Sequence, residues 1–396
     1  MELNEKQKKA ITLAHDWFYS DSKQQFVIAG YAGTGKTTVV RAIIDDLGLS
    51  NQEVCFATYT GKAALVLTKM GCEAITLHKL IYMTQKIWDE KENCFKYIFT
   101  KYANLSMFLR LIVVDESSMV PPDIYKDLMS FGIKVIFLGD PGQLPPVTKD
   151  KTNNIMDNPD IFLTEIHRQA EGNPIIYLAT CAREGKWIEK NVNYNNKVFV
   201  IEKGSKLFKD KYLLNADQVL VGKNKTRDTY NDYIRQLLGK NPEHPEKGDK
   251  IIFTRNNWGE ILKTDNPKLD IPIVNGLVGT IEDIEMNTAF YNSNIQAARV
   301  LFSIQDDSVM TPLLVSCNTL SKEFKDTKPN FGRIAEYENK NECTINYADY
   351  GYAITVHKSQ GSQWNKVLVI NEYLGEHDKW LYTAITRAID KLILIM

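Results

Sequence analysis

Short runs of apolar residues recur along the first half of the chain, and each run ends in polar or glycine-rich residues. Residues 25–29, 111–114 and 134–138 are such runs. Continuous apolar runs of this length predict strands that are buried on both faces, as in a parallel sheet. Residues 38–47 follow the first run and carry the apolar spacing of a helix. Alternation of strands and helices predicts an α/β domain over residues 1–183.

Two segments depart from this pattern and alternate apolar with polar residues. Residues 84–103 contain two alternating stretches around a charged turn, which predicts a β-hairpin inserted into the first domain. Residues 247–347 also alternate with period two, which predicts an all-β insertion. Residues 184–246 and 348–396 return to apolar runs and predict a second parallel-sheet domain that the insertion interrupts.

Composition excludes several classes of protein. The chain has 396 residues, of which 44% are hydrophobic and 24% are charged, and its formal net charge is −1. No apolar run is long enough to span a membrane, and the N-terminus is polar, so we expect a cytoplasmic protein without membrane partners. A net charge near zero means that any nucleic-acid site must be a local groove of basic and aromatic residues.

The candidate chemistry begins directly after the first apolar run. Gly30-Tyr-Ala-Gly-Thr-Gly-Lys36-Thr37 matches the phosphate-binding loop pattern G-x-x-x-x-G-K-[ST]. Its glycines let backbone N–H groups face phosphate oxygens, Lys36 reaches the β- and γ-phosphates, and the Thr37 hydroxyl ligates Mg²⁺. The residues expected to hold the nucleotide here are Gly30, Ala32, Gly33, Thr34, Gly35, Lys36, Thr37 and Thr38.

Polar residues at the ends of the other two apolar runs complete a hydrolytic site. Asp115 and Glu116 follow residues 111–114, and Gln143 lies shortly after residues 134–138. Ligands bind at the carboxyl ends of strands in such sheets. We therefore expect Asp115 to hold Mg²⁺, Glu116 to polarise the attacking water and Gln143 to sense the γ-phosphate.

These segments occur in a particular order with several others. The set comprises Leu3–Ala10, Gly30–Thr38, Ala57–Ala64, Thr76–Leu80, Asp115–Met119, Gly139–Pro146, Leu163–Gln169, Tyr352–Gly361 and Leu381–Ala388. Together they resemble the motifs of a superfamily 1 DNA helicase of the RecD/Dda-like branch. The resemblance covers almost the whole chain.

The resemblance implies a fold, a cofactor set and further site residues. The fold is two RecA-like parallel-sheet P-loop domains with a β-hairpin pin at 84–103 and an SH3-like β insertion at 247–347. ATP with Mg²⁺ is implied, with Gln7 reading the adenine. Arg168 and Arg387 would reach the γ-phosphate, and Gly361 would line the nucleotide site.

The resemblance also implies movement in the 5′-to-3′ direction on single-stranded DNA. It suggests a monomer that unwinds duplex or forked DNA in replication, recombination or repair, in a bacterium or a phage-infected host. The alternative is a RecD-like subunit or nucleotide-gated interaction module of a larger complex. The expected DNA contacts are Thr60, Lys62, His78 and Lys79 on the first domain and Thr355, His357, Lys358 and Ser359 on the second.

The predicted hairpin supplies one more candidate DNA contact. Phe95, Tyr97 and Phe99 alternate with other residues, so they share one face of their strand. Phe95 lies nearest the turn and is the first choice for stacking on a base. Tyr97 and Phe99 are equally well explained by packing of the hairpin onto the first motor domain.

Overall fold

The computed structural model describes most of the chain as two compact units. The described residues are 3–89, 94–145, 155–165, 172–264, 270–287, 297–304, 309–317, 320, 338, 340, 343–372 and 376–396, without the side chains of 88, 89, 94, 95 and 287. The first unit comprises residues 1–82, 101–205 and 360–396, and the second comprises residues 83–100 and 206–359.

The first unit is built on a six-stranded sheet with the order β3-β2-β6-β7-β1-β8. The paired strands run parallel throughout, as the apolar runs predict. The phosphate-binding loop follows β1 and the acidic residues lie at the end of β6, two parallel strands separated only by β7, so both emerge at the same edge of the sheet. The strands are β1 (Gln25–Gly30), β2 (Val54–Thr58), β3 (Ala74–Thr76), β6 (Leu111–Asp115), β7 (Lys134–Gly139) and β8 (Ile161–Leu163).

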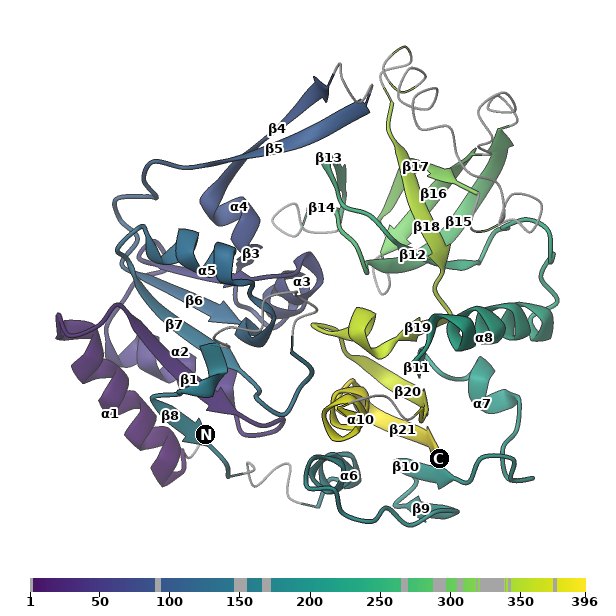
Figure 1. The fold of residues 1–396 in the computed structure, drawn as a ribbon, viewed down its shortest axis with the longest axis horizontal. Helices are drawn as coiled ribbons and strands as arrows, with labels where there is room; N and C mark the ends of the chain where they lie inside the picture. The colour runs from purple at the N-terminus through teal and green to yellow at the C-terminus, as the bar shows by residue number, and fades with distance from the viewer. Residues whose placement is uncertain are drawn as a thin grey trace. The chain divides into compact units, whose positions relative to one another are not determined.

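Helices cover both faces of this sheet because successive strand residues point to opposite sides. Phe26 and Ile28 of β1 pack with α1 and α2 on one face, whereas Val27 and Ala29 pack with α4 and α5 on the other (Figure 1). Each fully buried aliphatic or aromatic side chain stabilises the unit by about 1.5–3 kcal/mol. The helices of this part are α1 (Glu5–Tyr19), α2 (Lys36–Asp46), α3 (Gly61–Lys69), α4 (Leu77–Ile81) and α5 (Pro122–Met129), with short 3₁₀ turns η1 (Ser117–Met119) and η2 (Ile155–Asp157).

The first unit contains a second group of strands, two from the middle of the chain and two from its C-terminal part. In the first unit β10 pairs with β21, and β21 pairs with β20, all in parallel, while β9 is antiparallel to β10. Helices α6 (Pro174–Arg183) and α10 (His377–Ile385) pack against each other beside these strands. The strands are β9 (Val192–Tyr194), β10 (Val198–Ile201), β20 (Trp364–Ile370) and β21 (Ala388–Ile395).

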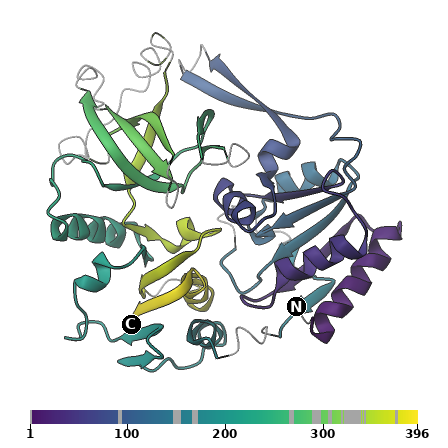
Figure 2. The same ribbon diagram turned by 180° about the vertical axis from the view of Figure 1, so that it is seen from behind.

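The second unit contains a short parallel pair of strands and a helix. Strand β11 (Gln218–Val221) pairs in parallel with β19 (Ala353–Thr355), and α8 (Asn224–Leu237) packs on both. Figure 2 shows α8 in teal, seen from behind. Helix α7 (Lys211–Leu214) and the 3₁₀ turn η6 (Val356–Ser359) complete this region.

The alternating segment folds into a closed barrel with the strand order β12-β15-β16-β17-β18. Phe253 and Phe302 meet at its centre with ring centroids 5.0 Å apart, and both are fully buried. The last barrel strand ends at Tyr350, so the expected domain limit at residue 348 falls inside a strand. The strands of this region are β12 (Lys250–Phe253), β15 (Val278–Asn287), β16 (Ala297–Ile304), β17 (Met310–Ser316) and β18 (Ile345–Tyr350), with a separate ribbon of β13 (Asn257–Leu262) and β14 (Ile271–Ile273).

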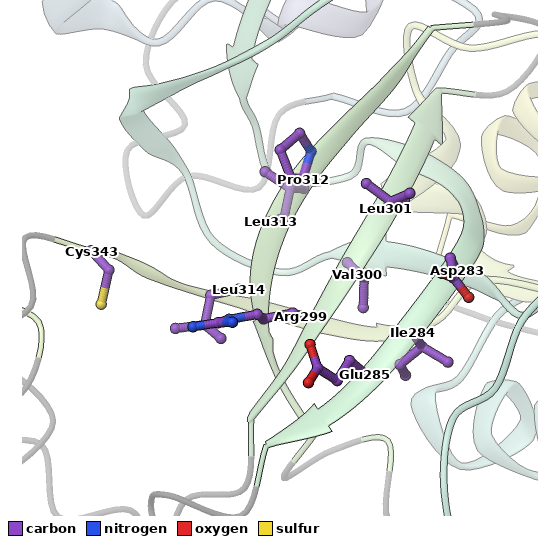
Figure 3. A pocket seen from close by; sticks show the side chains of 10 residues that line it. All are labelled: Asp283, Ile284, Glu285, Arg299, Val300, Leu301, Pro312, Leu313, Leu314 and Cys343. Atoms are coloured by element: carbon purple, nitrogen blue, oxygen red, sulfur yellow. The ribbon is translucent and has the colours of Figure 1, made fainter.

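A cavity of about 480 Å³ lies along strands β15, β16 and β17 of the barrel (Figure 3). Its lining includes the cross-strand pair Glu285 and Arg299 and the apolar residues Leu301, Pro312 and Leu314. Charges of both signs stand beside apolar carbons, so the lining favours no single class of ligand.

The predicted hairpin is present as β4 (Tyr82–Asp89) and β5 (Cys94–Lys101). Tyr97 and Phe99 pack against β13 in the second unit, which corrects the expectation that they pack onto the first motor domain; the side chain of Phe95 lies outside the described residues. The Tyr97 hydroxyl donates to Asn257 Oδ1 at 2.7 Å and accepts from the Gly259 N–H at 3.1 Å. The Phe99 ring meets Trp258 edge-on at 5.7 Å. These contacts link residues far apart in the sequence. The alternation of residues along the hairpin strand therefore could not predict which segment its aromatic residues would contact.

No described helix combines the length and the apolar character that a membrane span requires.

Candidate nucleotide site

The loop between β1 and α2 has the backbone geometry of a phosphate cradle. Gly33 and Gly35 have φ values of 80° and 79°, a left-handed conformation that favours glycine. A Cβ atom at Gly30 would lie 2.7 Å from the Thr34 hydroxyl, so this position also excludes a side chain. Lys36 begins α2 and donates from Nζ to the Gly30 carbonyl at 2.7 Å. The loop therefore presents an ammonium group and a helix N-terminus at one place.

The Gln7 side chain holds this loop through a hydrogen bond to its backbone. Its Nε2 donates to the Thr34 carbonyl at 3.1 Å, and its Oε1 accepts from the Asn4 N–H at 3.0 Å as part of the cap of α1. Gln7 is buried and is not among the described residues that line the nearby cavity. The adenine-reading role of Gln7 stays a prediction, since both ends of its amide bond to protein groups.

Two carboxylates lie at the carboxyl end of β6, as predicted: Asp115 is its last residue and Glu116 follows it. Asp115 Oδ1 accepts from the Glu116 N–H at 2.8 Å. Glu116 has φ 51° and ψ 38°, a left-handed conformation that costs a non-glycine residue about 1–2 kcal/mol. Such strain is typical of functional sites and re-aims the side chain that follows the strand. Burial raises the pKa of both carboxyl groups, which the Lys36 ammonium opposes, and Arg387 opposes it further at Glu116.

The turn after β7 brings Gln143 to the same region. The Gln143 N–H donates to the Asp140 carbonyl at 3.1 Å, which closes the turn. The next residue, Leu144, donates its N–H to Thr383 Oγ1 at 2.9 Å, and its carbonyl accepts from Gln360 Nε2 at 2.8 Å. Side chains from the C-terminal part of the chain thus fix this turn.

Arg387 follows α10 and is only 2% exposed. Its guanidinium donates to the carbonyls of Thr383 at 3.0 Å and Ser362 at 3.2 Å, and to the Thr386 hydroxyl at 3.2 Å. These bonds hold the guanidinium in one orientation. A preoriented arginine is suited to stabilise negative charge that develops during a reaction.

These groups meet in a cavity of about 320 Å³, within the range of small-molecule sites. The structure brings together the following predicted residues: Ala32, Gly33, Gly35, Lys36, Thr37, Thr38, Asp115, Glu116, Gln143, Gly361 and Arg387. Gly30 and Thr34 shape the loop beneath them. Arg168 lies outside the described residues, so its role stays a prediction.

The first group of candidate DNA contacts belongs to the first unit. Thr60 caps α3 by accepting from the Ala63 N–H at 3.3 Å, and the Lys62 ammonium lies 4.2 Å from the centroid of the Trp364 ring. His78 on α4 is half-buried between aromatic rings, and burial lowers its pKa, so the ring favours the neutral form. Lys79 is exposed.

The second group belongs to the second unit and differs in exposure. His357 is exposed and Lys358 is half-buried, whereas Thr355 is buried. Ser359 is fully buried and donates its hydroxyl to the Val356 carbonyl at 2.7 Å. In this structure the Ser359 side chain completes a 3₁₀ turn instead of facing outward. Of these four residues only His357 is exposed, and the DNA contacts of the segment stay predictions.

Sequence reasoning did not single out several residues of the nucleotide site. Tyr31, Asp140, Gln363 and Thr386 line the cavity. Tyr382 bonds to the phosphate-binding loop through its hydroxyl. Asp140 lies in the motif segment Gly139–Pro146, and Tyr382 and Thr386 lie in Leu381–Ala388. Their position next to predicted site residues in these segments could have indicated them.

Comparison with known proteins agrees with this site. A model of the AAA domain matches residues 2–204, which is more than half of the chain. A model of the UvrD-like helicase C-terminal domain matches residues 350–395. The chain belongs to the superfamily 1 helicases of the RecD, Dda and Pif1 type, and it is an ATP hydrolase.

Three relatives illustrate the range of the family. The ATP-dependent RecD2 DNA helicase of Deinococcus radiodurans is 26% identical over 92% of this chain but only 46% of its own length. The ATP-dependent DNA helicase dda of Enterobacteria phage T4 is 25% identical over 73% of this chain and 69% of its own. The ATP-dependent DNA helicase Pif1 of Campylobacter jejuni is 23% identical over 91% and 86%.

Solved structures agree on the fold. The Pif1 helicase of Candida albicans has a TM-score of 0.50 and 16% identity, and the match covers 100% of this chain and 94% of that one. A Bacteroides Pif1 bound to single-stranded DNA also has a TM-score of 0.50, with 18% identity and 100% and 92% coverage. The expected fold class of two RecA-like parallel-sheet domains is confirmed.

Proposed function

We propose that this protein uses ATP hydrolysis to move in the 5′-to-3′ direction along single-stranded DNA and to unwind duplex or forked DNA. It acts as a monomer in the cytoplasm, in replication, recombination or repair. The observation that supports the proposal most strongly is the cavity that gathers Lys36, Glu116, Gln143 and Arg387. A site that only binds nucleotide does not require a base, a phosphate sensor and an arginine together.

The residues of the cavity fit ATP with Mg²⁺. The Thr37 hydroxyl and the Asp115 carboxylate line the cavity, and oxygen donors of this kind suit Mg²⁺. When bound, Mg²⁺ supplies positive charge to the β- and γ-phosphate oxygens. The positive φ values of Gly33 and Gly35 let the loop curl so that its backbone N–H groups can face phosphate oxygens. Thr37 and Asp115 would hold the ion.

Hydrolysis then divides among the chain's own groups. Glu116 accepts the proton of the attacking water as the water oxygen bonds to the γ-phosphorus and the bond to the ADP oxygen breaks. Lys36 and Arg387 stabilise the negative charge that moves onto the phosphate oxygens. Gln143 contacts the γ-phosphate from the turn after β7. Arg387 lies between α10 and β21. When the γ-phosphate leaves, Arg387 loses its contact, and the change passes to β21 and the strands paired with it.

Single-stranded DNA should stimulate ATP hydrolysis, and its affinity should fall steeply with salt. Lys79, His357 and Lys358 offer groups for phosphate contacts, and each phosphate neutralised on a single strand contributes a log–log slope of about −0.7. The measurement is ATPase rate with and without an oligonucleotide, together with binding by fluorescence anisotropy across a salt series. An affinity that does not change with salt contradicts a backbone groove.

The hairpin should separate the strands while the motor pulls one of them. Phe95 is two residues closer to the turn than Tyr97, whose hydroxyl anchors the strand to β13. Stacking of an aromatic ring on a base contributes roughly 1–3 kcal/mol. We expect Phe95→Ala to slow duplex unwinding by about tenfold and to leave DNA-stimulated ATP hydrolysis nearly intact. Deleting residues 90–94 should slow unwinding further.

The matched variant for this test is Tyr97→Phe, which keeps the ring and removes only the anchoring hydroxyl. It loses two bonds to β13 and leaves the sequence of the tip, including Phe95, unchanged. Unwinding and ATP hydrolysis are measured on the same preparation of each variant. Unchanged unwinding by Phe95→Ala, or an equal fall in both activities, contradicts an independent separating role.

A further inference from the structure

A buried tyrosine joins the phosphate-binding loop to the turn that carries Gln143. Tyr382 of α10 is 1% exposed. Its hydroxyl accepts from the Ala32 N–H at 2.8 Å and donates to Asp140 Oδ2 at 2.6 Å. A phenol offers one donor and acceptor lone pairs, so both functions of this hydroxyl are used. The two partners come from different loops of the nucleotide site.

Asp140 extends the link to Gln143. Its other carboxylate oxygen accepts from the Gly142 N–H at 2.9 Å, and its carbonyl accepts from the Gln143 N–H at 3.1 Å. A Cβ at Gly142 would lie 3.0 Å from the Tyr382 ring, so the turn fits closely against the tyrosine. The orientation of Gln143 therefore depends on a turn that Tyr382 holds at one end.

Ala32 lies on the other side of the link, within the loop that lines the cavity. Amides of such loops face phosphate oxygens, so their orientation decides how the phosphates are held. The Ala32 N–H points at the Tyr382 hydroxyl and not at a phosphate, so this bond fixes the backbone from which the phosphate-facing amides of the loop continue. The next residue of α10, Thr383, accepts from the Leu144 N–H, and Arg387 follows the same helix.

Packing of the ring does not explain why residue 382 carries a hydroxyl group. The Tyr382 ring also meets Tyr31 edge-on at 6.4 Å, and a phenylalanine would preserve that contact. A buried hydroxyl is costly unless it forms hydrogen bonds, and here both of its partners belong to the loops around the phosphates. The hydroxyl is thus placed to align them.

We propose that Tyr382 is a positioning residue for ATP hydrolysis, which holds the Ala32 amide and the Gln143 turn in the mutual arrangement that the γ-phosphate requires. Through α10 it also ties this arrangement to Arg387. The proposal rests on ATP hydrolysis at this site and not on DNA translocation. Its test is therefore run first without DNA and then with it.

The first variant is Tyr382→Phe, which removes the hydroxyl and keeps the ring. Because misalignment acts on the transition state, we expect kcat for ATP to fall about tenfold or more while KM stays within about threefold. The control is Tyr125→Phe, which removes a hydroxyl bonded to Gln25 Oε1 at 2.6 Å in the same unit, away from the cavity. The control should keep both constants.

The second variant is Asp140→Asn. An asparagine has one oxygen and one NH₂ group, so it cannot accept hydrogen bonds from both the Tyr382 hydroxyl and the Gly142 N–H. It should lower kcat in the same way, and the double variant should be no slower than the slower single variant, because both changes break one link. If Tyr382→Phe does not fold, Asp140→Asn carries the same prediction.

Three results overturn the proposal. One is a kcat of Tyr382→Phe within about twofold of the unaltered protein, even with a lower melting temperature. Another is a loss that falls on KM with kcat retained. The third is a double variant whose loss is the product of the two single losses. None of these results bears on DNA unwinding, which strand displacement on duplexes with a single-stranded tail tests separately.

Discussion

Glu116→Gln should abolish ATP turnover and leave nucleotide binding nearly unchanged. Glutamine has the size of glutamate but cannot accept the proton of the attacking water, and loss of a positioned base costs about 10²–10⁴-fold. Glu116 lies in a strained left-handed conformation directly after β6 and beside Asp115. Glutamine keeps that backbone position. Binding of a fluorescent nucleotide and steady-state ATP hydrolysis measure the two effects.

Lys36→Ala is the comparison variant, because it separates a loss of the nucleotide site from a loss of the catalytic base. The ammonium lies at the loop that holds the β- and γ-phosphates, so its loss should weaken binding and lower turnover together, with turnover falling about 10²-fold or more. Wild-type hydrolysis by Lys36→Ala contradicts the nucleotide site itself. Retained turnover by Glu116→Gln would instead remove Glu116 from the role of base and leave the site standing.

Arg387→Ala should lower turnover far more than it weakens nucleotide binding. An arginine at the γ-phosphate matters most once charge has moved in the transition state, and such arginines contribute about 10³–10⁵-fold to kcat. The bonds of Arg387 to the Thr383 and Ser362 carbonyls hold it ready for this role. The readouts are kcat and the affinity for a non-hydrolysable ATP analogue.

Arg387→Lys is the matched variant because it keeps the charge and loses the planar fork. It should recover binding and only part of the turnover. Equal losses in binding and turnover for Arg387→Ala, with a lower melting temperature, indicate a structural arginine instead. Arg168→Ala carries the same prediction from the sequence alone.

The sequence predicts the nucleotide site well because its parts are local. A glycine-rich loop between a buried strand and a helix has few conformations, and Lys36 and Thr37 follow it directly. The carboxyl ends of parallel strands lie at one edge of the sheet, which brings Asp115 and Glu116 of β6 to the same edge as the loop after β1. The cavity confirms that these residues lie together.

Contacts between distant segments could not be predicted in the same way. Tyr382 reaches Ala32 across 350 positions, and Tyr97 reaches Asn257 across 160. Neither pair leaves a periodic signal. The same reason explains why the compact units cut across the expected domains: hydrogen bonds from α10 attach the C-terminal residues to the first unit.

The expected DNA contacts are harder to predict because they depend on side-chain direction. Ser359 and Thr355 share a segment with His357, yet both are buried and His357 is exposed. The segment forms a short 3₁₀ turn that the apolar pattern does not specify. Strand β14 is three residues long and contains Pro272, so the alternating pattern does not specify it either.

Strand displacement on two tailed duplexes tests the central claim most directly. The substrates share one duplex and differ only in whether the single-stranded tail is 5′ or 3′. With ATP, we expect the 5′-tailed duplex to be unwound, the 3′-tailed duplex to stay intact, and Lys36→Ala to unwind neither. Unwinding of the 3′-tailed duplex alone contradicts the direction of movement, and ATP hydrolysis without unwinding of either duplex contradicts the helicase and favours a nucleotide-gated subunit of a larger complex.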